Sequence, residues 1–418
     1  MTPSWRLVAA LCLVLVFCGL LLSNAALLCL ALPLLAFVLA PIVGPSPRTI
    51  ASAKAETRRV TSVEGESFSV LITVTNLGPG IPFARMDVDV PPSIKIQDEP
   101  ILAASFPRGG SRSLHLRLAG PRGRHAFRHL RLETRDALGL WAAEQVLPLD
   151  VVAAVLPRID RIERVDIFPR KAGAIAGSVR SRVSGSGSEF FGTREYSSGD
   201  PLRQLNWRAA ERWDRLVTNL YEEEKSADVG IILDARQASE VEAHGTSLFE
   251  CALRMAASLA EYFLRRSNRV GLLSYGRALD WVFPGYGQEQ RRKILAMLCS
   301  ATPSDHAVFR DFRNLPIRLF PPRSQLVFVS PLLPADVHTL RYLRAIGFEL
   351  LVISPDPLSF EAGNAETDPY RVLARKILKS RRDVIFTTLR RSGARVMEWD
   401  VRVPPGVSLL QLGRRAPR

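Results

Sequence analysis

A short segment in the middle of the chain gathers acids, arginines and aromatic residues, the side-chain types from which many catalytic sites are built. It reads EFFGTREYSSGDPLRQLNWRAAERWDRL and runs from Glu189 to Leu216. Two carboxylates whose pKa values are pushed apart can share the roles of general acid and general base. One hypothesis is therefore a membrane-bound hydrolase. The side chains that could take part in such chemistry are Glu189, Arg194, Glu195, Asp200 and Arg212, and the same five together with Tyr196 and Trp207 are candidates for a clasp or a protein-binding surface.

The same segment also has the features of a structural clasp. Gly199 and Asp200 form a turn, and Pro201 suits the first turn of a helix. The Asp200 carboxylate can accept hydrogen bonds from the free N–H groups of that turn. We expect arginines of the segment to pair with its acids. We also expect Leu205 and Leu216 to pack inward with Trp207 and Trp213. No phosphate-binding loop, H-E-x-x-H or G-x-S-x-G pattern accompanies it, and histidine is scarce, with 6 in the chain. We therefore predict a structural clasp, either alone or with a protein-binding surface on it, and no catalytic residue.

A second candidate site follows the first buried strand of the C-terminal region. The apolar run Asp228–Asp234 ends in an aspartate, as in von Willebrand factor type A domains, which it resembles and which bind a divalent ion through D-x-S-x-S. Here Arg236 and Ala238 stand where the two serines belong, and Ser330 stands at a neighbouring strand end where such domains often have Asp. The pattern predicts a degenerate site with no metal and no cofactor, in which Asp234 pairs with Arg236 or caps the next segment. A divalent-metal-dependent ligand-binding module at this strand end is the alternative.

The elements around these sites indicate several domains. From Asp228 onward, apolar strands alternate with amphipathic helices, the pattern of a parallel sheet covered on both faces. We assign residues 189–410 to the clasp plus this von Willebrand type A-like (Rossmann-like) α/β domain. Short alternating strands over 56–157 predict an immunoglobulin-like β-sandwich. Between them, 158–188 is rich in Gly and Ser and reads as a flexible linker.

Residues 1–47 contain two apolar runs, Leu7–Leu22 and Ala25–Val43, which predict a transmembrane helical hairpin. A cleavable signal peptide ending near Ser23 is the alternative for the first run. Because basic residues flank the pair and the turn has none, we expect a multi-pass plasma-membrane protein with cytoplasmic soluble domains. The 5 cysteines show no disulfide-like spacing, which suits a reducing compartment.

The chain is basic, with 56 Lys and Arg against 41 Asp and Glu in 418 residues. Genomic base composition explains such an excess as well as a negatively charged partner does. The basic segment 371–391 is read as a core-packed helix with a solvated basic face, or as a contact with anionic lipid. Aromatic residues are not interleaved with its basic residues, so no nucleic-acid partner is predicted.

The stretch from Gly185 to Ser239 resembles the signature of the family known as domain of unknown function fifty-eight. The order of a helical hairpin, a β-rich middle with a D-x-x-G-L-W turn, and a von Willebrand type A-like domain also resembles that family. The resemblance implies a non-catalytic adaptor or scaffold that works with a MoxR-type AAA+ ATPase in protein assembly or maturation. It leaves the client and the oligomeric state open.

Overall fold

The structure is a computed structural model of the full chain. It describes residues 3–43, 51–56, 58–98, 102–135, 142–165, 179–225, 227–243, 245–276, 279–305, 310–361 and 369–414. The chain divides into two compact units, Met1–Leu156 and Pro157–Arg418, and each is considered by itself. The turn expected at Asp136–Trp141 lies outside the described residues.

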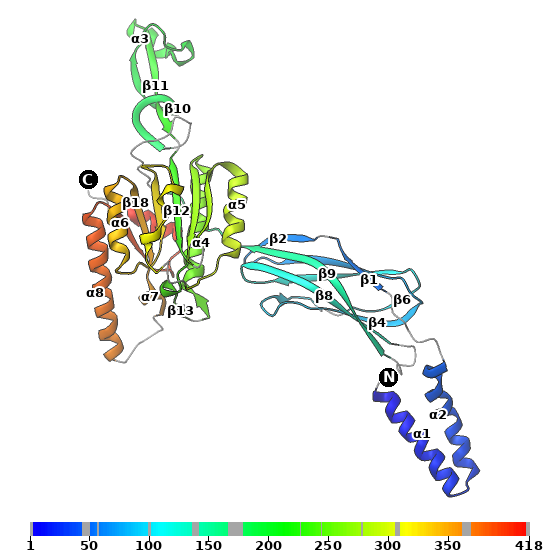
Figure 1. Ribbon diagram of the computed structural model, residues 1–418. Helices are drawn as coiled ribbons and strands as arrows, with labels where there is room; N and C mark the ends of the chain where they lie inside the picture. The colour runs from blue at the N-terminus through cyan, green and yellow to red at the C-terminus, as the bar shows by residue number, and fades with distance from the viewer. Residues whose placement is uncertain are drawn as a thin grey trace. The chain divides into compact units, whose positions relative to one another are not determined.

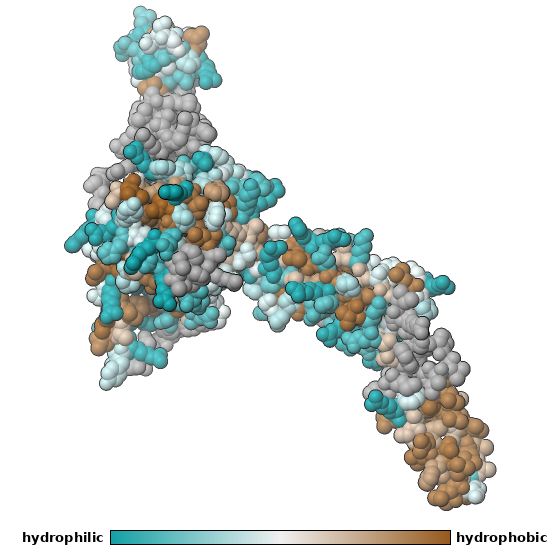
Figure 2. All heavy atoms as spheres, viewed as in Figure 1, coloured by the Kyte–Doolittle hydropathy of each residue, from teal (hydrophilic) through white to brown (hydrophobic). Residues whose placement is uncertain are grey.

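Two helices open the first unit, α1 (Pro3–Leu21) and α2 (Ala25–Val43) (Figure 1). They run antiparallel, since Trp5 Nε1 donates to the Val38 carbonyl at 3.1 Å. Their visible side chains are mostly apolar (Figure 2).

These helices do not meet the expectation of a membrane hairpin. Across the described part of the chain, no helix combines the length and the apolarity that crossing a bilayer requires. Each has 19 residues, about 28 Å at about 1.5 Å per residue, whereas a span takes about 20 apolar residues. The transmembrane hairpin predicted over 1–47 is therefore wrong, and so is the multi-pass plasma-membrane location with cytoplasmic domains that was derived from it.

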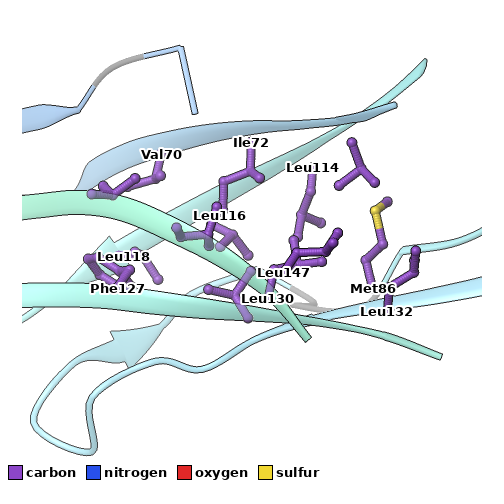
Figure 3. Close-up of a cluster of buried hydrophobic side chains, with 14 of the residues drawn as sticks. Val70, Ile72, Met86, Leu114, Leu116, Leu118, Phe127, Leu130, Leu132 and Leu147 are labelled. Carbon is purple, nitrogen blue, oxygen red and sulfur yellow. The ribbon is translucent and has the colours of Figure 1, made fainter. Parts of the chain in front are cut away.

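The rest of the first unit is a two-sheet β-structure. One sheet has the order β1-β3-β7-β5 and the other β2-β9-β8-β4-β6. Alternate residues of the strands point into one core, which Figure 3 shows with Val70, Leu116 and Phe127 among its members. The alternation of buried and exposed residues in β3 and β7 is the period-2 pattern read from the sequence. The strands are β1 (Ala51–Ala55), β2 (Arg59–Val63), β3 (Phe68–Asn76), β4 (Ile81–Val88), β5 (Lys95–Ile96), β6 (Leu102–Phe106), β7 (Ser111–Ala119), β8 (Gly123–Arg135) and β9 (Ala142–Leu156).

The segment expected to be a linker has structure at both of its described ends. Near its start, the Asp160 amide donates to Ser258 Oγ at 2.8 Å, which ties the chain to helix α4 (Leu248–Arg265). At its end, β10 (Val179–Glu195) pairs antiparallel with β11 (Val217–Lys225). The flexible linker assigned to 158–188 thus overlaps a strand.

The core of the second unit is a six-stranded sheet of order β16-β15-β12-β17-β18-β19, parallel except for β16. Helices α4 and α5 pack together against it, and α6 and α8 pack together with the cluster that contains Phe328 and Leu340. The expected alternation of strands and helices is present. The strands are β12 (Asp228–Asp234), β15 (Arg269–Tyr275), β16 (Leu279–Gly285), β17 (Gln325–Val329), β18 (Glu349–Pro355) and β19 (Arg395–Trp399).

The helices of the second unit begin and end at ordinary signals. Ser247 caps α4 by accepting from the Glu250 amide, and Gly393 follows α8 with a φ of 86°. The helices are α3 (Trp207–Trp213), α5 (Gly287–Ser300), α6 (Asp336–Ala345), α7 (Pro357–Glu361), α8 (Pro369–Arg391) and α9 (Pro405–Arg414), and the remaining short pieces are η1 (Leu202–Gln204), η2 (Gln237–Ser239), η4 (Phe312–Asn314), η5 (Ile317–Leu319), β13 (Glu242–Ala243) and β14 (Thr246–Ser247).

Candidate functional site

The clasp segment forms the far end of a two-stranded ribbon made by β10 and β11, with η1 and α3 between the strands (Figure 1). We call residues Tyr196–Leu216 the ribbon tip. Its chain is held by backbone bonds from Tyr196 N to Leu216 O and from Asn206 N to Val217 O. Asn206 also caps α3, because its Oδ1 accepts from the Ala209 amide at 3.0 Å. The tip is therefore a defined surface built from local hydrogen bonds.

Asp200 in the tip and Glu195 directly before it are engaged by arginines and an amide. Arg194 Nη2 donates to Asp200 Oδ1 at 2.6 Å, and the Ser197 amide donates to Asp200 Oδ2 at 3.0 Å. Arg215 pairs with Glu195. The Ser197 amide and the Arg194 guanidinium hold the pKa of Asp200 below its usual range. A general acid needs the opposite shift, so this arrangement suits a fastened turn better than proton transfer.

The aromatic residues of the tip are placed differently from the expectation. Leu205 is buried, but Leu216 is exposed, and Trp207 and Trp213 are 66% and 50% exposed. The prediction that both tryptophans pack inward is wrong, since α3 is a seven-residue helix with no buried residue. The Arg215 guanidinium lies 5.8 Å from the centre of the Trp213 ring. Two tryptophans on a hydrogen-bonded support thus face outward.

The remaining clasp candidates are spread along the ribbon. Tyr196 follows β10, and Arg212 lies in the last turn of α3. Asp200 does not cap a helix as expected. It closes the Ser197–Asp200 turn, while the piece after Pro201 is the 3₁₀ turn η1 without a side-chain cap. The backbone of Glu189 belongs to β10, and its side chain lies outside the described residues.

The second candidate site lies at the carboxyl end of β12. Arg236 Nε donates to Asp234 Oδ1 at 2.8 Å, and Nη2 donates to Asp234 Oδ2 at 2.7 Å. The same guanidinium reaches Asp336, the first residue of α6, through Nη1 at 2.9 Å and Nη2 at 2.8 Å. It lies over the Phe312 ring at 4.1 Å. One buried cation thus bridges two buried carboxylates, and the pairing of Asp234 with Arg236 is the one read from the sequence.

The oxygens that might otherwise bind an ion are occupied within this network. Ser239 Oγ and Ser330 Oγ donate to Asp234 Oδ2 at 2.8 and 2.6 Å. The amides of Leu333 and Phe312 donate to Asp336. Ala238 lies in η2 and has no side-chain oxygen to offer.

The electrostatics of the network favour a charged arginine. Burial alone would lower the pKa of Arg236, but the hydrogen bonds and charge of Asp234 and Asp336 outweigh it and raise the pKa. Burial raises the pKa of Asp336 in spite of its contacts with Arg236, and the hydroxyls and amides that donate to the two acids offset part of that cost.

Little space remains beside this network. The crevice that Asp234, Arg236 and Ser239 line has a volume of about 10 Å³, at the lower limit for a single water. Mg²⁺ keeps several waters of its own. In the described ranges, no group of three or more His, Cys, Asp or Glu side chains is arranged to hold a metal.

Sequence reasoning missed Asp336, Ser239 and Phe312. Asp336 is an acid in the first turn of the helix after β17, and parallel strands bring such positions to one edge of the sheet. An acid at this edge of the sheet could therefore have been expected from the sequence. Which acid contacts Arg236, however, depends on the conformation of the loop between Ser330 and α6.

Comparisons with known proteins agree with the family resemblance over part of the chain. Residues 192–354 match the family described as protein of unknown function DUF58. The chain is similar to the uncharacterized protein YeaD of Bacillus subtilis (strain 168), at 27% identity over 164 residues. That stretch is 39% of this chain and 39% of the relative, so the chain spans well under two thirds of the relative it matches.

Among solved structures, two similarities illustrate the level of likeness. A PapD-like domain of human CEP192 is 12% identical with a TM-score of 0.20, covering 28% of this chain and 92% of that one. Native alpha-2-macroglobulin from Escherichia coli is 13% identical with a TM-score of 0.22, covering 32% of this chain and 22% of that one. Scores of this size carry no argument about the fold, which rests on the strand pairing itself.

Proposed function

We propose that this chain, a DUF58 protein by its match over residues 192–354, is a non-catalytic adaptor that binds another protein through its ribbon tip. The observation that carries the proposal is the outward placement of Trp207 and Trp213 on a tip whose backbone is held by hydrogen bonds. Tryptophan and arginine dominate the energetics of protein interfaces. A firm support also lowers the entropy lost on binding.

The non-catalytic part of the proposal is supported by the two candidate chemical sites. Asp200 is held in its ionised form by Ser197 and Arg194. The carboxylates of Asp234 and Asp336 are bridged by Arg236. In this proposal the carboxyl end of β12 is a structural junction that needs no metal. The resemblance to the family names a MoxR-type AAA+ ATPase as the partner, and assembly or maturation of other proteins as the process.

The test is a binding measurement between the purified full chain and the MoxR-type ATPase of the same organism, with and without ATP. The wild-type chain is expected to bind. Trp207→Ala and Trp213→Ala are each expected to weaken the free energy of binding by about 2 kcal/mol or more, which raises Kd roughly 30-fold. Trp281→Ala is the matched control, because Trp281 is 46% exposed and belongs to β16, outside the tip.

Two results would contradict the proposal. Equal binding by the tip variants and the control would remove the tip as the interface, and no binding by the wild type would remove this partner. A screen for hydrolase activity adds a separate check of the non-catalytic part. Turnover that Glu195→Gln or Asp200→Asn abolishes would replace the adaptor with an enzyme.

A further inference from the structure

Helix α8 carries an apolar stripe whose side chains are largely exposed. The stripe consists of Tyr370, Leu373, Ile377 and Val384, with Ser380 at the intervening position. Their spacings of three, four and seven residues place them on one side of a helix. They are 82%, 56%, 48% and 64% exposed. We call these residues the outer stripe.

The helix packs on the domain through a different side. Its buried residues are Arg382, Phe386 and Leu389. At about 100° per residue, Phe386 follows Ile377 by nine residues and so points about half a turn away from it. The outer stripe therefore contributes nothing to the core that Phe386 and Leu389 join.

The first half of α8 has no buried side chain at all. Every residue from Pro369 to Arg381 is exposed or half-buried, and packing begins only at Arg382. Apolar and polar side chains both lie on the visible surface of the helix (Figure 2). A helix that continues for several turns beyond its packed part, with an apolar stripe along it, exposes surface that burial against another helix would stabilise.

The net positive charge of α8 favours an acidic partner for the stripe. The helix has a single acid, Asp383, against eight basic residues, which are Arg371, Arg375, Lys376, Lys379, Arg381, Arg382, Arg390 and Arg391. An acidic partner is attracted, whereas a second copy of the same helix is repelled. Lys376, Arg381 and Arg390 flank the stripe at the positions that set partner choice when helices pair, and the acid Asp383 lies at one such position between them.

We propose that the outer stripe binds an acidic amphipathic helix of another protein, side by side along α8. The period of the stripe is that of a helix-pairing seam, and small Ala374 and Ser380 lie in or beside it, which lets a second helix approach closely. A nucleic-acid surface would interleave aromatics with its basic residues, and Tyr370 is the only aromatic of the stripe. The inference is independent of the ribbon tip and would give an adaptor a second contact.

The test uses the purified full chain and a labelled synthetic helical peptide of about four heptads, with Leu at the two seam positions and Glu at the flanking ones. A matched peptide carries Lys at the flanking positions. Fluorescence anisotropy is expected to show binding of the acidic peptide, at least about tenfold tighter than the basic one, and weaker at high salt.

Variants then assign the binding to the stripe. Leu373→Gln combined with Ile377→Gln keeps helix propensity. The double variant is expected to bind the acidic peptide with an affinity about tenfold or more lower than that of the wild type. Val407→Gln is the matched control, since Val407 is 50% exposed on α9, and it is expected to bind as the wild type does. Unchanged Tm values for both variants establish that each still folds.

Three results would overturn the inference. The first is equal affinity for the two peptides, and the second is unchanged affinity for the acidic peptide in the double variant. The third is a wild-type chain that does not bind the acidic peptide but binds phosphatidylglycerol vesicles or a single-stranded oligonucleotide, with that binding lost in the double variant. The ribbon-tip variants are expected to leave peptide binding unchanged, so a failure here is distinguishable from a failure of the proposed function.

Discussion

Arg236 Nη2 lies 2.8 Å from Asp336 Oδ2, joining two residues that are 100 positions apart in the sequence. The same nitrogen contacts Asp234 at 2.7 Å, and the side chains of Arg236 and Asp336 are 3% and 0% exposed. A side-chain cation thus lies between the carboxyl end of β12 and the start of α6, where it contacts both acids. Its positive charge is covalently attached to the chain.

We predict that Arg236→Met strongly destabilises the unit Pro157–Arg418. The change leaves two buried carboxylates without their cation, and breaking a buried pair in this way costs about 3–5 kcal/mol. Urea unfolding of the full chain measures it. Arg265→Met is the control, because Arg265 is 78% exposed in its pair with Glu261, and it should change stability far less. If Arg236→Met lowers the free energy of unfolding no more than the control does, the bridge contributes little to stability.

We predict that Arg236→Ser combined with Ala238→Ser creates a divalent-ion site. The double variant supplies two hydroxyls beside Asp234 and frees the space of the guanidinium, giving hard oxygen ligands that Mg²⁺ and Mn²⁺ prefer. Calorimetry with Mn²⁺ should give heat for the variant and none for the wild type. Heat of binding from the wild type, lost in Asp234→Asn, would contradict the metal-free junction.

We predict that Asn206→Ala loosens the ribbon tip without affecting the sheet. Its side chain caps α3 and also donates to Asn219 Oδ1 at 2.9 Å, and losing an N-cap costs about 1 kcal/mol. Hydrogen exchange at the Ala209 amide should therefore speed up about fivefold. Arg203→Ala, an exposed change in η1, is expected to leave it as it was. Equal exchange in the two variants would mean that the cap does not hold α3.

We predict that Asp200 keeps its charge to a lower pH than an ordinary aspartate. Its pKa is lowered from 3.8, chiefly by the Ser197 amide and then by Arg194 against the opposing effect of burial. A lowered folded pKa means that the stabilisation is complete above the unfolded value and is lost as the pH falls through the folded one. The window therefore lies below about pH 4.

A carboxyl ¹³C titration by NMR measures this pKa, and its midpoint should lie below 3.8. In Arg194→Ala the midpoint should rise, since one of the causes is removed. A wild-type midpoint at or above 3.8, or no change in Arg194→Ala, would show that the turn does not hold the carboxylate.

The N-terminal helices show where reading by composition overreached. Two apolar runs of about the length of a helix predicted two helices, and α1 and α2 are both present. Whether a helix can cross a bilayer depends on the length of the uninterrupted apolar helix, and in the described residues neither reaches it. The runs predicted the elements correctly and their role incorrectly.

The clasp shows a similar division between local and distant contacts. Arg194 and Asp200 are six residues apart, so their pairing was within reach of sequence reasoning. The positions of Trp207 and Trp213 were not, because exposure depends on what the rest of the chain places against a helix, and a seven-residue helix has too few turns for a pattern to show its buried side.

The sequence by itself determined the order of the strands and helices, because alternation in β3 and an apolar run in β12 are properties of neighbouring residues. It also placed Arg236 close enough in the chain to pair with Asp234. Only the tertiary structure decided that Asp336 completes the bridge and that the ribbon tip turns its tryptophans outward. Those outcomes depend on contacts between residues far apart in the chain, whose meeting is set by how the parallel strands align their carboxyl ends and by which surfaces the fold leaves uncovered.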